Sequence, residues 1–184
     1  MKPLLLFLFC FIICKSVVAQ CPPGDVQLND QIEVEEFLNN YSSCEIIAGD
    51  LFIGAGVTDL SGLTVIRKIE GSLLISQAEV TTFTNFYNLE FIGGNLIFDG
   101  LTKAEILTGF DKLKKIGGSF EITNWYKLSD IDAFDALEEI KGDFLISNSG
   151  LISLTGFGNL EIIHGNFELS NYPHGIADFG KLHT

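Results

Sequence analysis

The sequence has few basic residues, few cysteines, few prolines and, after its first segment, no long hydrophobic run. Eleven lysines and arginines stand against 24 aspartates and glutamates, giving a formal net charge of −13 over 184 residues. So few cations leave no surface that could follow the phosphates of a nucleic acid or the headgroups of anionic lipids. The 16 phenylalanines and the hydrophobic fraction of 47% exclude a disordered chain and suffice for one sizeable core.

The longest apolar run, Leu4–Cys14, is too short to span a bilayer. It follows Lys2 and precedes the small residues Val17–Ala19, so residues 1–19 have the three parts of a secretory signal peptide. We therefore expect a secreted or cell-surface protein whose chain contains no membrane span. Removal of the signal also removes two lysines, which leaves a still more acidic protein.

Cleavage after residue 19 reduces the cysteine count to two. Cys10 and Cys14 leave with the signal, and Cys21 and Cys44 remain as an even pair in an exported chain. Such a pair predicts a disulfide. The alternative is a lipid-modified Cys21, although Gln20 stands where a lipoprotein signal has a small residue.

A glycine-centred phrase, Ile-x-Gly-x-(Leu/Phe)-x-(Ile/Phe/Leu), repeats along the rest of the chain with a spacing of 22 to 24 residues. Its anchor glycines are Gly49, Gly71, Gly94, Gly118, Gly142 and Gly165. Counted from each anchor after the first, positions −11, −8, −5, −2, +2 and +4 are apolar in every copy. A period of this length is typical of a solenoid, in which each repeat buries its apolar face against its neighbours.

The repeat predicts strands and turns, with no room for a regular helix. Positions +2 and +4 alternate as in a short strand, and the remaining spacing of three fits tight turns. We therefore expect an all-β solenoid, a right-handed parallel β-helix of about six coils. Repeat length varies only at one corner, over residues 76–82, 99–106 and 123–130, where loops should leave the coil. Asn124, Asn148 and Asn171 recur there and are interpreted as turn formers.

An open solenoid end needs a cap, and residues 20–48 are predicted to supply it. Asp30 and Glu33 resemble a capping box. The apolar residues that follow have helical spacing: Val34, Phe37, Leu38 and Tyr41. The predicted organisation is a signal peptide over 1–19, a disulfide-linked cap over 20–48, and repeats over 49–184 that are truncated at the C-terminus.

Two phrases, Leu89-x-x-Ile92-Gly93-Gly94-Asn95-Leu96 and Leu113-x-x-Ile116-Gly117-Gly118-Ser119-Phe120, together with Cys21 and the helix before Cys44, resemble the receptor L domain. This is the leucine-rich-like, ligand-binding β-helix of the insulin and epidermal growth factor receptors. The regular repeats are more similar to stand-alone secreted members. The resemblance extends over roughly residues 21–184 and implies an extracellular, non-enzymatic module that binds a protein or glycan.

Catalytic and metal-binding patterns are scarce. The sequence has no Gly-x-Ser-x-Gly, His-Glu-x-x-His or paired Cys-x-x-Cys motif, and His164, His174 and His183 lack ligand spacing. One acidic cluster could serve a carbohydrate-active enzyme or hold calcium: Asp130, Asp132, Asp135, Glu138 and Glu139. Its outward positions in a regular copy favour a solvated acidic surface. We expect no enzyme activity, no cofactor and no metal.

The outward +3 position of the strands departs from the alternation expected of a water-facing sheet. Four of its six members are large and apolar: Phe52, Leu74, Ile97 and Leu145. Glu121 and Glu168 complete the row, and the neighbouring +1 row is small and polar. We interpret the apolar members as a ligand-binding surface, since the same face contributes to binding in the receptors that the chain resembles. The alternatives are stacking that only favours strand pairing, and a passive spacer or adhesin stalk.

One modification signal is present. Asn40-Tyr41-Ser42 is an N-glycosylation sequon, used only in a eukaryotic source.

Overall fold

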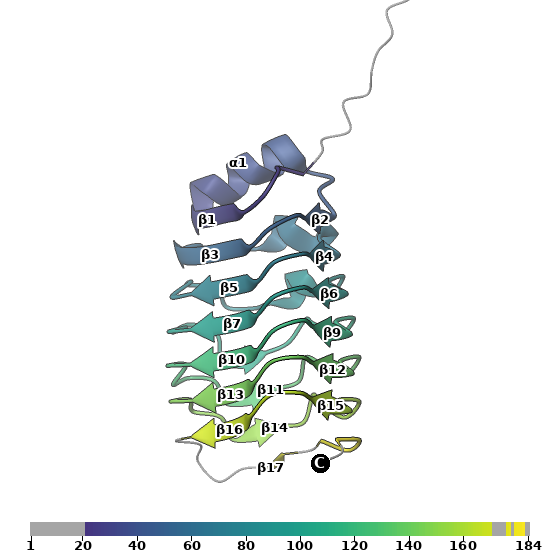
Figure 1. Cartoon of the computed structure of the whole chain (residues 1–184). Coiled ribbons are helices and arrows are strands. Elements are labelled where there is room, and N and C mark those ends of the chain that lie inside the picture. Colours follow the sequence, from purple (N-terminus) through teal and green to yellow (C-terminus); the bar gives the residue numbers. More distant parts are fainter. Residues whose placement is uncertain (1–20, 171–175, 178, 183–184) are drawn as a thin grey trace, which may run out of the picture.

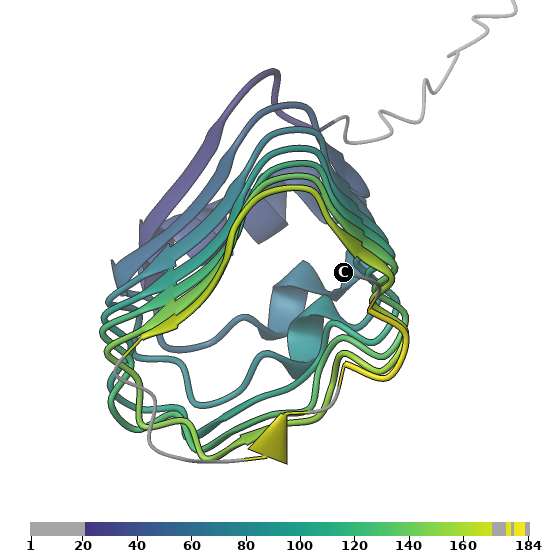
Figure 2. The same cartoon turned by 60° about the horizontal axis from the view of Figure 1, so that its bottom comes forward.

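The computed structural model describes residues 21–170, 176–177 and 179–182, in which the chain winds into a stack of parallel strands (Figure 1). Every strand pairs in parallel with its counterpart in the neighbouring repeat, and few helices are present. Figure 2 shows the successive coils lying one behind another around a common axis. The predicted all-β parallel solenoid is thus confirmed, while its right-handed sense and the count of about six coils stay predictions.

In the described part of the chain, three sheets run along the stack, and we name them A, B and C. Sheet A has seven strands: β1 (Val26–Asp30), β3 (Leu51–Gly56), β5 (Leu73–Ser76), β7 (Leu96–Asp99), β10 (Phe120–Thr123), β13 (Phe144–Ser147) and β16 (Phe167–Ser170). Sheet B has six: β2 (Ile46–Ile47), β4 (Lys68–Ile69), β6 (Phe91–Ile92), β9 (Lys115–Ile116), β12 (Glu139–Ile140) and β15 (Ile162–Ile163). Sheet C has four: β8 (Ile106–Leu107), β11 (Asp130–Ile131), β14 (Ser153–Leu154) and β17 (Ile176–Ala177).

The apolar positions of the repeat form the core. In-register pairing places Leu73 beside Leu96 and Ile75 beside Phe98, so equivalent side chains of successive coils form columns. All the repeat positions are buried except Ile163, Phe167 and Leu169, which lie in the last strands of sheets B and A. Burying each large apolar side chain contributes about 1.5–3 kcal/mol before the loss of conformational entropy is subtracted.

Phenylalanine rings stack in two of these columns. One column has neighbouring ring centroids 4.9 to 5.7 Å apart and contains Phe86, Phe110, Phe134, Phe157 and Phe179. In the other, Phe120, Phe144 and Phe167 stack at 5.0 Å. Rings of the two columns meet edge to face, as Phe120 does with Phe134. Each aromatic pair adds about 0.5–1.5 kcal/mol beyond its buried area, which favours exact coil register.

Helix α1 (Gln31–Tyr41) forms the predicted cap beside β1 at the end of the stack (Figure 1). The Asp30 carboxylate accepts the Glu33 N–H at 2.9 Å, as the capping box predicted. Val34 and Phe37 are buried against the first coil. Two short 3-10 helices, η1 (Ser61–Val65) and η2 (Thr84–Phe86), were not predicted and lie in coils that precede the first strand of sheet C. Among the described residues no helix is long and apolar enough to cross a membrane.

The corner after each of β5, β7, β10 and β13 is a left-handed turn. The residue at this corner has a positive φ in successive coils: Gln77 (57°), Gly100 (66°), Asn124 (56°) and Asn148 (51°). Asparagine and glycine tolerate this conformation better than other residues, so the interpretation of Asn124 and Asn148 as turn formers is confirmed. The two asparagine side chains also contact each other. Asn171 lies outside the described residues.

Cys21 and Cys44 form the predicted disulfide, which ties the start of the cap to the segment just after α1. We expect this bond to contribute roughly 3 kcal/mol to the free energy of unfolding, because it closes a loop of moderate length in the unfolded chain. Mass spectrometry of a non-reduced digest should find the two peptides linked, and reduction should lower the denaturation midpoint. Finding both thiols free, or Cys21 acylated, would contradict the prediction.

Candidate functional site

Three of the four predicted ligand-binding residues lie side by side on the outer face of sheet A. Phe52 pairs with Leu74, and Leu74 pairs with Ile97, on three adjacent strands spaced by about 4.8 Å. Leu145 is not part of this group. Glu121 on β10 lies between it and Ile97, because Glu121 pairs with both.

The three adjacent side chains form the floor of a shallow hollow of about 300 Å³. Its rim is polar and consists of Asp25, Gln27, Asp50 and Ser72. Phe52, Leu74 and Ile97 are half-buried, since each packs along the row while keeping one side open to water. An apolar floor with a polar, partly acidic rim suits an amphipathic ligand that covers the side chains and satisfies the rim.

The polar +1 row has a structural role that sequence reasoning missed. In six coils, one side-chain oxygen of the +1 residue accepts a hydrogen bond from the backbone N–H of the +1 residue in the next coil, at 2.6 to 3.0 Å. The acceptors are Asp25, Asp50, Ser72, Asn95, Ser119 and Asp143. This ladder requires a short side chain with an acceptor oxygen, which explains why the row is small and polar throughout.

Strand β1 also escaped the sequence analysis, although its signal is present. Gly24-Asp25-Val26-Gln27-Leu28 matches the Gly-x-apolar-x-apolar phrase one repeat before Gly49. Asp25 begins the +1 ladder, and Gln27 continues the outward row by pairing with Phe52. The outer face of sheet A therefore starts inside the segment assigned to the cap.

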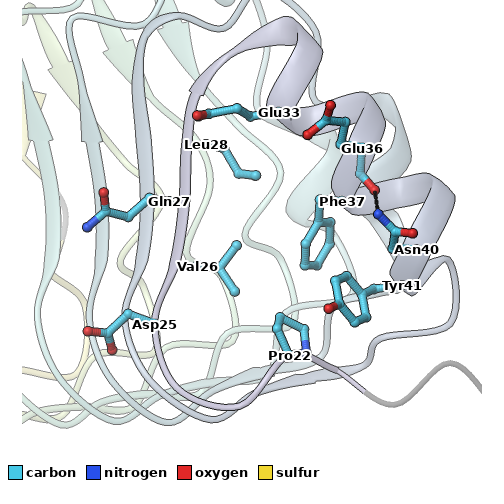
Figure 3. Close-up of a pocket in the computed structure, with 10 residues that line it drawn as sticks. All are labelled: Pro22, Asp25, Val26, Gln27, Leu28, Glu33, Glu36, Phe37, Asn40 and Tyr41. Carbon is cyan, nitrogen blue, oxygen red and sulfur yellow. Dashed lines mark hydrogen bonds between the residues drawn. The ribbon is translucent and has the colours of Figure 1, made fainter.

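A second depression, the cap groove, lies between α1 and β1 (Figure 3). It has a volume of about 330 Å³. Val26 and Leu28 reach it from β1, and Phe37 and Tyr41 point toward them from α1, as Figure 3 shows. The groove shares Asp25, Val26 and Gln27 with the hollow, so the two depressions border the same strand at the end of sheet A.

Asn40, the predicted glycosylation site, lies at the cap groove. It is exposed on α1, and its Nδ2 donates to the backbone oxygen of Glu36 at 2.8 Å (Figure 3). This placement leaves the side chain accessible, and its glycosylation stays a prediction.

Sheet B carries a different surface, built of ion pairs. Arg67 contacts Glu90 at 2.6 Å, and this hydrogen bond holds the pKa of Glu90 below its ordinary value. Hydrogen bonds from Lys115 and then from His164 likewise lower the pKa of Glu139. Each of these surface ion pairs contributes little to the free energy of unfolding. Together they neutralise cationic side chains on this face.

The acidic cluster considered for catalysis or calcium extends from sheet C through the connecting segment to sheet B. Asp130 belongs to β11 in sheet C, whereas Glu139 belongs to β12 in sheet B and is paired with Lys115. Asp132, Asp135 and Glu138 are exposed. Within the described ranges, no group of three or more His, Cys, Asp or Glu side chains is arranged to hold a metal ion.

Comparison with known proteins gives one match. The family model described as the receptor L domain matches residues 43–107 and 114–183, which together make up most of the chain. No curated protein and no solved structure gives a significant match.

Proposed function

The chain belongs to the receptor L domain family, and we propose that it recognises a protein ligand through the outer face of sheet A, centred on Phe52, Leu74 and Ile97. Receptor L domains are ligand-binding modules rather than enzymes. The acidic cluster does not favour an enzyme, since its members are spread over sheets C and B and the segment between them.

The hollow on sheet A is the observation that carries this proposal. A sheet face exposed to water normally presents polar side chains, because the opposite face already supplies the core. Here three large apolar side chains stand together on the outer face, above a core that is complete without them. Apolar floors with polar rims are typical of recognition surfaces.

Leu145 is proposed as a separate, weaker contact on the same face. Its strand neighbours in the outward row are Glu121 and Glu168, so it is flanked by carboxylates instead of apolar side chains. A ligand that extends along sheet A beyond β7 would reach it.

We further propose an extracellular setting, with the signal peptide removed before residue 20, the cap over 20–48 and right-handed coils over 49–184. The signal-like start and the Cys21–Cys44 disulfide support this setting. Secreted and surface proteins, and as an alternative their glycans, are then the ligands to test.

Single glutamate substitutions should weaken ligand capture. We expect Phe52→Glu, Leu74→Glu and Ile97→Glu each to weaken binding by about tenfold or more, because a carboxylate replaces apolar contact worth roughly 1.5–3 kcal/mol. Wild-type protein and each variant would be compared as baits for extracellular proteins, and the dissociation constant of any recovered protein measured directly.

Ile106→Glu is the matched control. Ile106 is also an outward strand residue and is 47% exposed, but it lies on sheet C. Capture should survive this change. If all four variants capture like the wild type, the outward row serves only strand stacking, and the passive spacer becomes the better interpretation.

A further inference from the structure

Charge is distributed very unevenly along the chain. Residues 21–66 contain no lysine, arginine or histidine. They contain the acids Asp25, Asp30, Glu33, Glu35, Glu36, Glu45, Asp50 and Asp59. The cap, the first strand of sheet B and the strands β1 and β3 are therefore free of cationic side chains, and the potential around them is negative.

The outer face of sheet A is also free of cations along its whole length. None of its strands contains a basic residue, and Glu121, Glu168 and Asp143 add negative charge beyond the hollow. In contrast, Arg67, Lys68 and Lys115 belong to the ion pairs on and beside sheet B. Both depressions thus lie in the part of the molecule that lacks positive charge.

Carboxylates border the apolar surface of both depressions. Asp25 and Asp50 border the hollow, and Glu33 and Glu36 border the cap groove. Asp25 and Asp50 each use Oδ1 to accept a backbone N–H of the next coil. Their Oδ2 atoms are not engaged by any described residue and can pair with a donor from outside.

The edge of sheet A can add main-chain hydrogen bonds beside β1, the strand that both depressions border. β1 pairs only with β3, and Val26 donates to the Asp50 carbonyl. Alternate residues of a parallel strand bond to opposite sides, so the N–H and C=O of Gln27 face the open edge. Asn29 is the next residue whose backbone faces this edge, and its N–H already donates to the Glu33 carboxylate. The free edge is therefore short and suits an extended segment that pairs over few residues.

We propose that the hollow and the cap groove together hold one extended, positively charged segment of the protein ligand. This inference rests on the proposed function and names its partner. Apolar side chains of the segment cover Phe52, Leu74 and Ile97, while its lysines or arginines pair with Asp25, Asp50 and Glu36. Acidic polysaccharides are repelled from the same surface.

The test uses short random peptides displayed as a library and selected on the wild-type protein, with Leu74→Glu protein as the counter-selection. Peptides that need Leu74 should be enriched in lysine or arginine beside apolar residues. Their binding, measured by fluorescence anisotropy on synthetic copies, should weaken as salt increases, because screening reduces the attraction between exposed charges.

Two triple variants with the same change in net charge distinguish the effect of carboxylates at the two depressions from the effect of the protein's overall charge. Asp25→Asn, Glu36→Gln and Asp50→Asn together should weaken the selected peptides about tenfold. The asparagines keep the ladder, since Asn95 already performs this role in its own coil. The control combines Asp111→Asn, Glu138→Gln and Glu161→Gln at exposed positions away from both depressions, and should change binding less than twofold.

Each contrary outcome has a distinct meaning. Leu74-dependent peptides that are neutral or acidic, equal effects of the two triple variants, or direct binding of heparin to this surface of the protein would overturn the cationic partner and leave the proposed function standing. Selection of peptides that bind regardless of Leu74, or failure to select any, would count against both the cationic segment and the proposed binding face.

Discussion

Replacing Leu73 with glutamate should unfold the protein, whereas the same replacement at its neighbour Leu74 should leave it folded. Leu73 is fully buried and pairs with Leu96 in a column of the core. A carboxylate there would lose its hydration without gaining a partner, at a cost of several kcal/mol. Leu74 faces outward and is only half-buried, so its glutamate stays hydrated and should cost about 1 kcal/mol or less.

Chemical denaturation, monitored by circular dichroism, measures the stability of the two variants. We expect a normal two-state curve for Leu74→Glu and no cooperative transition for Leu73→Glu. Equal destabilisation by the two substitutions would mean that the outward row is covered structure, and the binding face on sheet A would have to be abandoned.

The repeat pattern alone predicts most of the architecture, because inward and outward positions have different chemistry in every copy. The apolar positions +2 and +4 became the inward side chains of sheet A, as in Leu73 and Ile75. Position −2 became the inward side chain of sheet B, as in Ile69. The confirmed disulfide and capping box depend equally on local patterns.

The candidate site was predictable only in part. The outward row identified Phe52, Leu74 and Ile97, and their adjacency follows from the in-register stacking of consecutive repeats. In the order of the repeats, Glu121 already stands between Ile97 and Leu145. Grouping the apolar members of the row by residue type alone does not show this separation. The separation became evident once each strand had a definite neighbour.

The rim of the hollow and the cap groove could not be derived from the repeat. Both depend on β1, whose phrase begins at Gly24 inside a segment assigned to the cap, and on where α1 packs. Packing of a helix against a sheet edge is set by side-chain shapes such as those of Phe37 and Tyr41, which have no periodic signature. The uneven distribution of charge was visible in the sequence. It indicated a type of ligand only after the structure placed both depressions in the part of the molecule that lacks basic residues.

The anchor glycine of the repeat has a steric explanation. At all six anchors, a Cβ would collide with the oxygen of the +1 side chain in the preceding coil, the same oxygen that accepts the next backbone N–H. At Gly118 the obstructing group is the Asn95 side chain, and the Gly94 carbonyl carbon would lie only 2.8 Å away. The glycine and the polar +1 row therefore depend on each other, since the ladder is possible only where no side chain fills this space.

Gly118→Ala should consequently destabilise the protein by about 3 kcal/mol, because the added methyl group must displace backbone and break the Asn95–Ser119 hydrogen bond. Gly158→Ala is the matched control, since a Cβ at Gly158 meets no atom within 4 Å. It should be neutral or stabilise by up to about 1 kcal/mol through the unfolded chain. Urea denaturation of both variants measures the difference. If alanine is tolerated equally at the two glycines, close packing between coils does not explain why the anchor is glycine. The hydrogen-bond ladder would then not account for the Gly-x pattern of the repeat.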